Sequence, residues 1–400
     1  MVASVADRTR RRQIVAEILS FAVGAVLLLA AIRVDRQWIG RHVTQPNLWP
    51  EREVGPHVWG ARALLVSVGI VVLAFVRPWL VGVLRATSIA KLAASTGATL
   101  IAVAGSLVTV EGHLRWRESR GKPTRLTYEL HGVPHPRYGW IWTPSQNVTE
   151  VVAGREVRWS FNREGIRLPA EGREPDPSAP TILFTGESIA AGVGLEYGET
   201  YPALVGQHLG VQSVNLAANA YGSDQAYLRL VDFMPRFPRL VATVTLFLPV
   251  QLSRNLEDDK PRLVIGKSGA LELVPAATDF LSRLRVRKLL SNDLPYLGNG
   301  AIDRTLAVTS RVLRETAERT RARGARQVFV IPSYGPPRTL DEHPEAWIVR
   351  SLFVQQGLPF VMVDIPSEFL LNGNPHPGPG GAAKIAAAIE RALAPGPAAN

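Results

Sequence analysis

The distribution of hydrophobic positions divides the chain into two parts. Three long apolar segments come first, at residues 14–34, roughly 60–84 and roughly 90–110. A stretch of about 20 apolar residues can cross a bilayer as a helix. From residue 181 onward the apolar runs are short and alternate with amphipathic stretches. The pattern therefore predicts a membrane region followed by a globular domain.

The apolar segments have the features of membrane helices. The first follows a cluster of arginines between residues 8 and 12, and it is longer than the apolar core of a typical signal peptide. The second is interrupted by Arg77-Pro78, so a buried or interfacial helix is the alternative there. The third is rich in Gly, Ala, Ser and Thr, which favour close packing of membrane helices. We expect about three transmembrane helices within residues 1–111.

Charge sets the expected orientation. The formal net charge is +11, and most of the excess flanks the apolar segments within residues 1–121. Basic residues beside membrane helices favour the cytoplasmic side. The arginine cluster, with Arg85 and Lys91, therefore predicts a cytoplasmic N-terminus in a bacterial inner membrane and a periplasmic or extracellular C-terminal domain. The first loop, which carries three arginines, runs against this rule. The distribution also argues against a nucleic-acid partner.

The next segment has a different composition. Residues 112–180 are polar and rich in Arg, Pro and Trp, and residues 134–167 contain short stretches typical of β-strands. We interpret residues 112–180 as a small strand-rich lead-in to the main domain.

Residues 181–400 have the pattern of an α/β domain. Buried parallel strands read as continuous runs of Val, Ile, Leu and Phe, and helices separate them. The predicted strands lie at residues 181–185, 211–217, 241–248, 326–333 and 358–366, and the predicted helices at 198–210, 303–324 and 380–393. The expected fold is a three-layer αβα sandwich with a parallel sheet. Ligands bind such sheets at the carboxyl ends of the strands.

One serine lies just past the first predicted strand, in TGESIAAG (185–192). A serine nucleophile needs a base, usually histidine, and donors for the oxyanion that forms on attack. The G-x-S-x-G elbow is not matched, because residue 190 is alanine. The chain has no cysteine, which excludes disulfides, thiolate metal sites and a cysteine nucleophile. The alternative for Ser188 is a structural serine at a helix start.

Three stretches together resemble the SGNH (GDSL-like) hydrolases. TGESIAAGVG resembles their first block, NLAANAYGSDQ (215–225) their second, and GNPHPGPGGAAKIAAAI (373–389) their fourth. The lead-in resembles segments that precede the motif in envelope-associated members, so the likeness covers roughly residues 134–394. It implies that Ser188 is the nucleophile and His376 the general base. It also implies that the backbone N–H groups of Ser188 and Gly222 belong to the oxyanion hole. The family's fold is flavodoxin-like and needs neither a cofactor nor a metal.

The oxyanion-hole side chain departs from the family's pattern. The third block, usually G-x-N-D, is absent, and the chain reads PVQLSRN after the strand at 241–248. Gln251 and Asn255 are the two candidates, with Gln251 slightly favoured by position. Beside the serine, Glu187 replaces the family's aspartate, a position that does not react.

The base also lacks the family's acid partner. Gly373 and Asn374 occupy the third and second positions before His376. An asparagine can orient an imidazole but cannot stabilise its positive charge as a carboxylate does. Asn374 is therefore one candidate for orienting the base, and the acids Asp364 and Glu368, which are nearby in sequence, are others. A serine–histidine dyad or a weakened site is the alternative.

A second His-Pro pair occurs in DEHPE (341–345). The family's histidine belongs after the last strand and before the closing helix. His376 fits that place, whereas His343 precedes another strand and is expected to be a surface loop residue.

Three functions are compatible with these features. The first is a membrane-anchored serine esterase that acts on acylated glycans or lipids of the cell envelope. The second is an O-acyltransferase to an envelope polysaccharide, which would need a separate acyl-donor protein because three spans are too few for a fused donor domain. The third is a catalytically weak or inactive domain that binds glycan.

Overall fold

The computed structural model describes residues 2–43, 48, 51–86, 89–120, 132–169, 174–287 and 296–394 of the 400-residue chain. The chain forms two compact units. Residues 1–40 and 51–124 make the membrane unit, and residues 41–50 and 125–400 make the second unit. The second unit therefore includes a segment that lies between the first two apolar stretches in sequence. The separate status of residues 112–180 stays a prediction.

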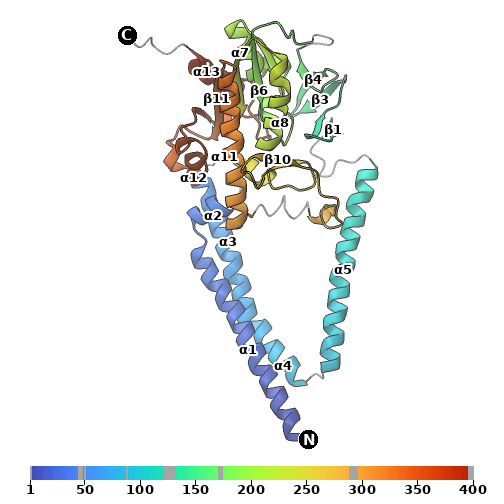
Figure 1. Cartoon of the computed structure of the whole chain (residues 1–400). Coiled ribbons are helices and arrows are strands. Elements are labelled where there is room, and N and C mark those ends of the chain that lie inside the picture. The colour runs from blue at the N-terminus through green and yellow to red at the C-terminus, as the bar shows by residue number, and fades with distance from the viewer. Residues whose placement is uncertain are drawn as a thin grey trace. The chain divides into compact units, whose positions relative to one another are not determined.

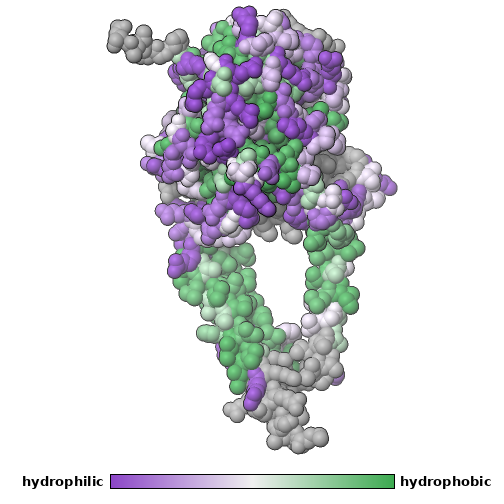
Figure 2. All heavy atoms as spheres, in the orientation of Figure 1, coloured by the Kyte–Doolittle hydropathy of each residue, from purple (hydrophilic) through white to green (hydrophobic). Residues whose placement is uncertain are grey.

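The membrane unit is helical (Figure 1). Its elements are α1 (Val2–Arg33), the start of α2 (Arg36–His42), α3 (Glu51–Val71), a π-helical segment (Val72–Val76), α4 (Arg77–Ala86) and α5 (Ile89–Ser119). Three stretches are long and apolar enough to cross a membrane: Gln13–Arg33, Val54–Val83 and Ala94–Arg117. Apolar side chains cover most of the coloured surface of these helices in the view of Figure 2. The expectation of three such helices is confirmed.

Two local features shape the membrane helices. Pro78 lacks an N–H and its ring crowds the carbonyl four residues earlier, which accounts for the π-helical turn at Val72–Val76. Close packing occurs between α1 and α3, where a Cβ added to Gly69 would lie 3.0 Å from Leu28 Cδ2. In α5, by contrast, Gly97 has no atom within 4 Å of an added Cβ.

A single eight-stranded sheet organises the second unit. Its order is β12-β11-β8-β6-β7-β5-β4-β3. The parallel part consists of β6 (Thr181–Thr185), β7 (Gln212–Asn215), β8 (Leu240–Leu246), β11 (Arg326–Tyr334) and β12 (Phe360–Ile365). In chain order these five strands lie 2-1-3-4-5, the flavodoxin-like arrangement, whose ligand site is at the switch point between the first and third strands. The predicted α/β fold is confirmed.

Helices pack on the parallel strands in two groups. Helices α7 (Tyr201–Leu209) and α13 (Pro379–Leu393) contact one another and the sheet, and so do α8 (Ser223–Phe233) and α11 (Asn299–Ala322). Every residue of β6 is buried, so both faces of the central strand are covered. The α8 and α11 ribbons lie side by side in Figure 1. This burial explains why the strands read as continuous apolar runs.

The lead-in strands extend the same sheet. Strands β3 (Asn147–Val152), β4 (Arg155–Phe161) and β5 (Arg167–Leu168) form an antiparallel edge, and β5 pairs with β7 at Arg167 and Asn215. Two hairpins, β1 (Gly132–His135) with β2 (Gly139–Trp142) and β9 (Arg262–Ile265) with β10 (Leu271–Val274), lie outside it. The short helices are α6 (Ser188–Ala191), α9 (Gln251–Arg254) and α12 (Ala346–Val349), which continues as a π-helical segment (Arg350–Val354).

Candidate active site

Ser188 lies at the start of α6, directly after the central strand β6. Gly186 makes the turn possible, because its φ of +145° disfavours other residues and an added Cβ would lie 2.9 Å from Leu246 Cβ. Glu187 is the N-cap of α6 and accepts a hydrogen bond from the N–H of Ile189 at 3.0 Å. The serine is therefore presented at the carboxyl end of the sheet, at its switch point.

A buried arginine fixes the far end of this short helix. Arg167 of β5 donates to the carbonyl oxygens of Ala191, Gly192 and Leu195 at 2.7, 2.9 and 2.5 Å. Its guanidinium lies 3.8 Å from the centre of the Trp159 ring. Burial lowers the pKa of Arg167 to about 9, so the group stays charged at neutral pH. The lead-in strands thus support the serine helix directly.

Ser188 and His376 are in hydrogen-bonding contact. The serine Oγ lies 2.8 Å from His376 Nε2. The loop that carries His376 is closed by the hydrogen bond from Leu371 N to His376 O at 2.9 Å. Tyr334, the last residue of β11, donates from its hydroxyl to Pro375 O at 2.6 Å. The histidine is therefore held in place between the last strand and α13.

Asn374 takes the position behind the histidine. Its Oδ1 lies 2.6 Å from His376 Nδ1 and also accepts the backbone N–H of His376 at 3.0 Å. An amide oxygen only accepts, so His376 Nδ1 carries the proton and Nε2 is free to accept one. Asp364 lies on β12, where it pairs in register with Ser333. The structure thus brings Asn374, and not Asp364, to the outer nitrogen of the ring.

The imidazole is suited to act as a base. Burial lowers the pKa of His376, Glu187 opposes this shift, and Arg254 adds to it. The net direction is down from the ordinary value of 6.5. His376 is therefore neutral at neutral pH, as a proton acceptor must be.

Glu187 touches the same serine from the other side. Its Oε2 accepts the Ser188 hydroxyl at 2.5 Å and lies 3.6 Å from Arg254 Nη1. Only 2% of Glu187 is exposed. Burial disfavours its ionisation, but Arg254, His376 and the hydrogen bonds from Ser188 and Ile189 together lower its pKa below the ordinary value. From the sequence, Glu187 was expected not to react, and no motif pointed to Arg254. The one signal for Arg254 was its place three residues after Gln251.

Gly222 begins α8 close to the short helix α9. Its N–H donates to Gln225 Oε1 at 3.0 Å, so an oxyanion would have to displace that side chain to use it. A Cβ added at Gly222 would lie 2.5 Å from Asn255 Oδ1. Arg254 connects this region to Glu187, because its Nη1 also donates to Tyr221 O at 3.3 Å.

The two oxyanion candidates of the third block differ in their bonding. Asn255 Nδ2 donates to Ser223 Oγ at 2.7 Å and to Thr309 Oγ1 at 2.9 Å, so both of its hydrogens have short bonds. Gln251 Nε2 reaches only Leu246 O, at 3.5 Å. Both side chains are buried. The hydrogen bond donated by the Gln251 amide is therefore longer and weaker than those donated by the Asn255 amide.

His343 does not join the site, but neither is it a surface residue. It is 3% exposed, and its Nε2 lies 3.3 Å from Ser333 Oγ. The expectation of a surface loop histidine is therefore wrong. The ring is buried just before α12, and the Ser333 hydroxyl is within hydrogen-bonding distance of one of its nitrogens.

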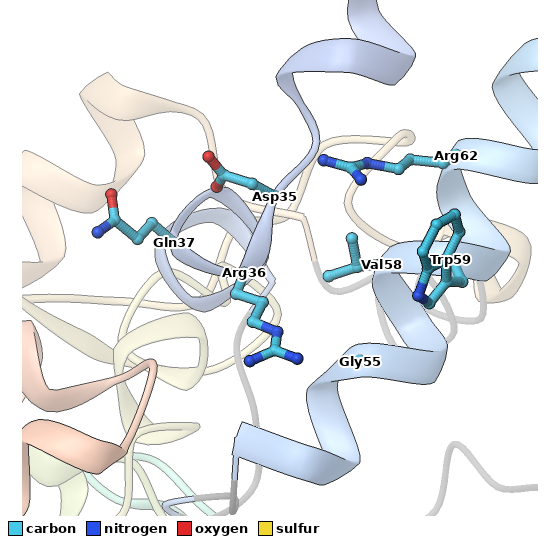
Figure 3. A pocket seen from close by; sticks show the side chains of 7 residues that line it. All are labelled: Asp35, Arg36, Gln37, Gly55, Val58, Trp59 and Arg62. Carbon is cyan, nitrogen blue, oxygen red and sulfur yellow. The ribbon is translucent and has the colours of Figure 1, made fainter.

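The membrane unit contains a pocket of its own. A cavity of about 580 Å³ is lined by residues of α2 and α3 and by the turn before α2 (Figure 3). Arg36, Arg62, Asp35 and Trp59 contribute the polar and aromatic surface. None of its lining residues belongs to the Ser188 constellation. Among the described residues, no group of three or more histidine and carboxylate side chains is placed to hold a metal ion.

No protein-family model and no curated protein matches the sequence. Three similar solved structures are a G-D-S-L family protein of the lipolytic type from Desulfitobacterium hafniense DCB-2, an acetyl xylan esterase from the rumen bacterium Butyrivibrio proteoclasticus, and a carbohydrate esterase. Their identities are 10, 10 and 12%, and their TM-scores are 0.31, 0.33 and 0.32. The matches cover 53, 55 and 64% of this chain and 98, 64 and 86% of theirs. The likeness concerns fold alone.

Proposed function

We propose that this chain is a membrane-anchored serine ester hydrolase with Ser188 as nucleophile and His376 as general base. The observation that carries the proposal is the 2.8 Å contact between Ser188 Oγ and His376 Nε2, with Asn374 Oδ1 bonded to the opposite ring nitrogen. A serine with a purely structural role at the start of a helix would not need a histidine partner. A serine bonded to a neutral, oriented imidazole at the switch point of an α/β sheet is arranged for nucleophilic attack.

The reaction follows from this geometry. As Ser188 Oγ bonds to the ester carbonyl carbon, its proton moves to His376 Nε2, and the carbonyl electron pair moves onto oxygen. The Ser188 N–H and the Gln251 amide would stabilise that oxyanion, and the Gly222 N–H would join them once the oxyanion displaces Gln225 Oε1 from it. His376 then protonates the leaving alcohol, and water releases the acyl group by the reverse sequence. Gln251 is preferred over Asn255 because its amide holds only a long hydrogen bond.

The location of the site supports an envelope substrate. Segment 41–50 belongs to the catalytic unit: His42 Nδ1 bonds Leu297 O at 2.7 Å, and Leu48 is fully buried. The loop after the first span and the catalytic domain must then lie on the same side of the membrane. With the N-terminal arginines in the cytoplasm, that side is outside the inner membrane. Acylated glycans or lipids of the envelope are the esters available there.

Fluorophosphonate labelling of the full chain in detergent tests the nucleophile. Wild type should label, Ser188→Ala should not, and His376→Ala should label about 10²- to 10⁴-fold more slowly because the base is gone. His343→Ala is the matched control and should label at the wild-type rate once it is shown to be folded. Wild type that labels no better than Ser188→Ala would refute the proposal. If wild type labels but turns over an ester only after a glycan is added, acyl transfer is indicated.

Reporter fusions test the side of the membrane. A periplasmic reporter joined after residue 50 or 115 should be active, and one joined after residue 87 should be inactive. A cytoplasmic signal at residue 115 would contradict the proposed orientation.

A further inference from the structure

No carboxylate contacts His376 Nδ1 among the described residues, where Asn374 lies instead, but the carboxylate of Glu187 contacts the Ser188 hydroxyl. Resting on the proposed function, we propose that Glu187 is a catalytic residue: its carboxylate supplies the negative charge that stabilises the His376 imidazolium during attack. Asn374 orients the ring but is neutral, so the charge that an aspartate would provide must come from elsewhere.

The contacts at Ser188 Oγ carry this inference. The oxygen lies 2.5 Å from Glu187 Oε2 and 2.8 Å from His376 Nε2. Because both contact the same oxygen, Glu187 Oε2 and His376 Nε2 lie within about 6 Å of each other. At that range an opposite charge favours the ionised form of a group. Glu187 is almost completely buried, so water screens this attraction weakly.

The proton inventory assigns the roles. The Ser188 hydroxyl has one proton and faces two acceptors, because His376 Nδ1 already carries the ring proton towards Asn374. During attack the hydroxyl proton goes to Nε2, and Glu187 takes up none. The imidazolium that forms is then paired with a carboxylate that was negative throughout.

The surroundings keep Glu187 ionised and in place. Arg254 Nη1 lies 3.6 Å from its Oε2, and its Oε1 caps α6 through the N–H of Ile189. Burial, and after it the negative charge of Glu187, raises the pKa of the Tyr201 and Tyr334 phenols. Both phenols stay neutral at neutral pH, so Arg254 is the charged partner of Glu187 before attack, and the His376 imidazolium joins it during attack.

The test combines two substitutions in the full chain. Glu187→Gln removes the charge but keeps an oxygen for the helix cap, and Asn374→Asp restores a charge behind the ring. Labelling of Glu187→Gln should be about 10-fold slower at pH 7.5, the rate equivalent of losing about one pKa unit of imidazolium stabilisation. Asn374→Asp should accelerate labelling far more in the Glu187→Gln background than in wild type. Equal gains in both backgrounds, or labelling of Glu187→Gln within about two-fold of wild type, would overturn the proposal.

A second measurement does not depend on turnover. The His376 ring signal can be followed by NMR with ¹³C-histidine and assigned by its loss in His376→Gln. Glu187→Gln should lower the His376 pKa by about one unit and Asn374→Asp should raise it. An unchanged pKa in Glu187→Gln would refute the role of Glu187, whereas absence of labelling in wild type would refute the proposed function. Glu187→Asp, which keeps the charge, should retain most of the wild-type pKa.

Discussion

Leu48 forms a parallel β-bridge with Ser333, and Tyr334 N donates to Leu48 O at 3.3 Å. One partner precedes the second membrane helix in sequence, and the other lies near the end of β11. Because the Tyr334 hydroxyl also holds Pro375, beside His376, the interhelical loop is connected to the base through two hydrogen bonds. The second unit therefore includes a residue that lies, in sequence, between the first two apolar stretches.

Leu48→Ala should destabilise the catalytic unit by about 2–5 kcal/mol, the usual cost of truncating a buried leucine. Leu48 is fully buried in a cluster with Phe247, Phe329 and Phe353. The measurement is thermal unfolding of the full chain in detergent. Leu209→Ala is the matched control, because Leu209 is 40% exposed on α7, and it should shift the transition little. Equal shifts for both variants would show that the loop does not contribute to the core.

Alanine substitution should distinguish the two candidates for the oxyanion side chain, because one variant should lose labelling rate and the other stability. Gln251→Ala should slow labelling by about 10²- to 10³-fold, the cost of one lost oxyanion donor, with little change in unfolding temperature. Asn255→Ala leaves Ser223 and Thr309 without a buried partner and should cost about 1–3 kcal/mol of stability. The reverse outcome would assign the oxyanion role to Asn255.

Gly222→Ala should damage the site for a steric reason. The new Cβ would lie 2.5 Å from Asn255 Oδ1 and 2.6 Å from Asp224 Oδ1, and both of these side chains are buried. Overpacking of this kind costs about 1–3 kcal/mol, so both stability and labelling rate should fall. Gly198→Ala is the control, since no atom lies within 4 Å of its added Cβ. If Gly222→Ala behaves like Gly198→Ala, the start of α8 is more adaptable than its contacts indicate.

Labelling should depend on pH through His376. Burial lowers its pKa below 6.5, so the neutral base persists at pH 6.5 and is lost only as the pH falls through the lowered value. Between pH 6.5 and that lowered value, His376 binds a proton in the unfolded chain but not in the folded chain. Stability should therefore also fall as the pH decreases through this range. Rates and unfolding temperatures measured from pH 4.5 to 8 check both effects. An acid limb centred above pH 6.5 would contradict the burial of this ring.

Much of the fold was predictable because period and burial agree. The strand predicted at residues 181–185 has the bounds of β6, and the helix predicted at 380–393 matches α13 within one residue. Helix α8 was missed, since most of its buried positions are polar or small. Only half of the buried positions of α11 are apolar. Thr305, Thr309, Thr316 and Thr320 are buried as well, and hydroxyls of this kind bond carbonyls of their own helix.

The sequence by itself determined the order of the motifs, with Ser188 just after β6 and His376 between β12 and α13, because local patterns decide where strands stop and helices start. It could not decide which groups surround the serine hydroxyl. Glu187, Arg254 and Asn374 come from three separate segments, and only the packing of those segments sets their distances. The same holds for Leu48, whose burial against β11 depends on a contact between residues far apart in the chain. Tertiary structure decided the electrostatics of the site, since charge interactions depend on distance and burial, which no local pattern encodes.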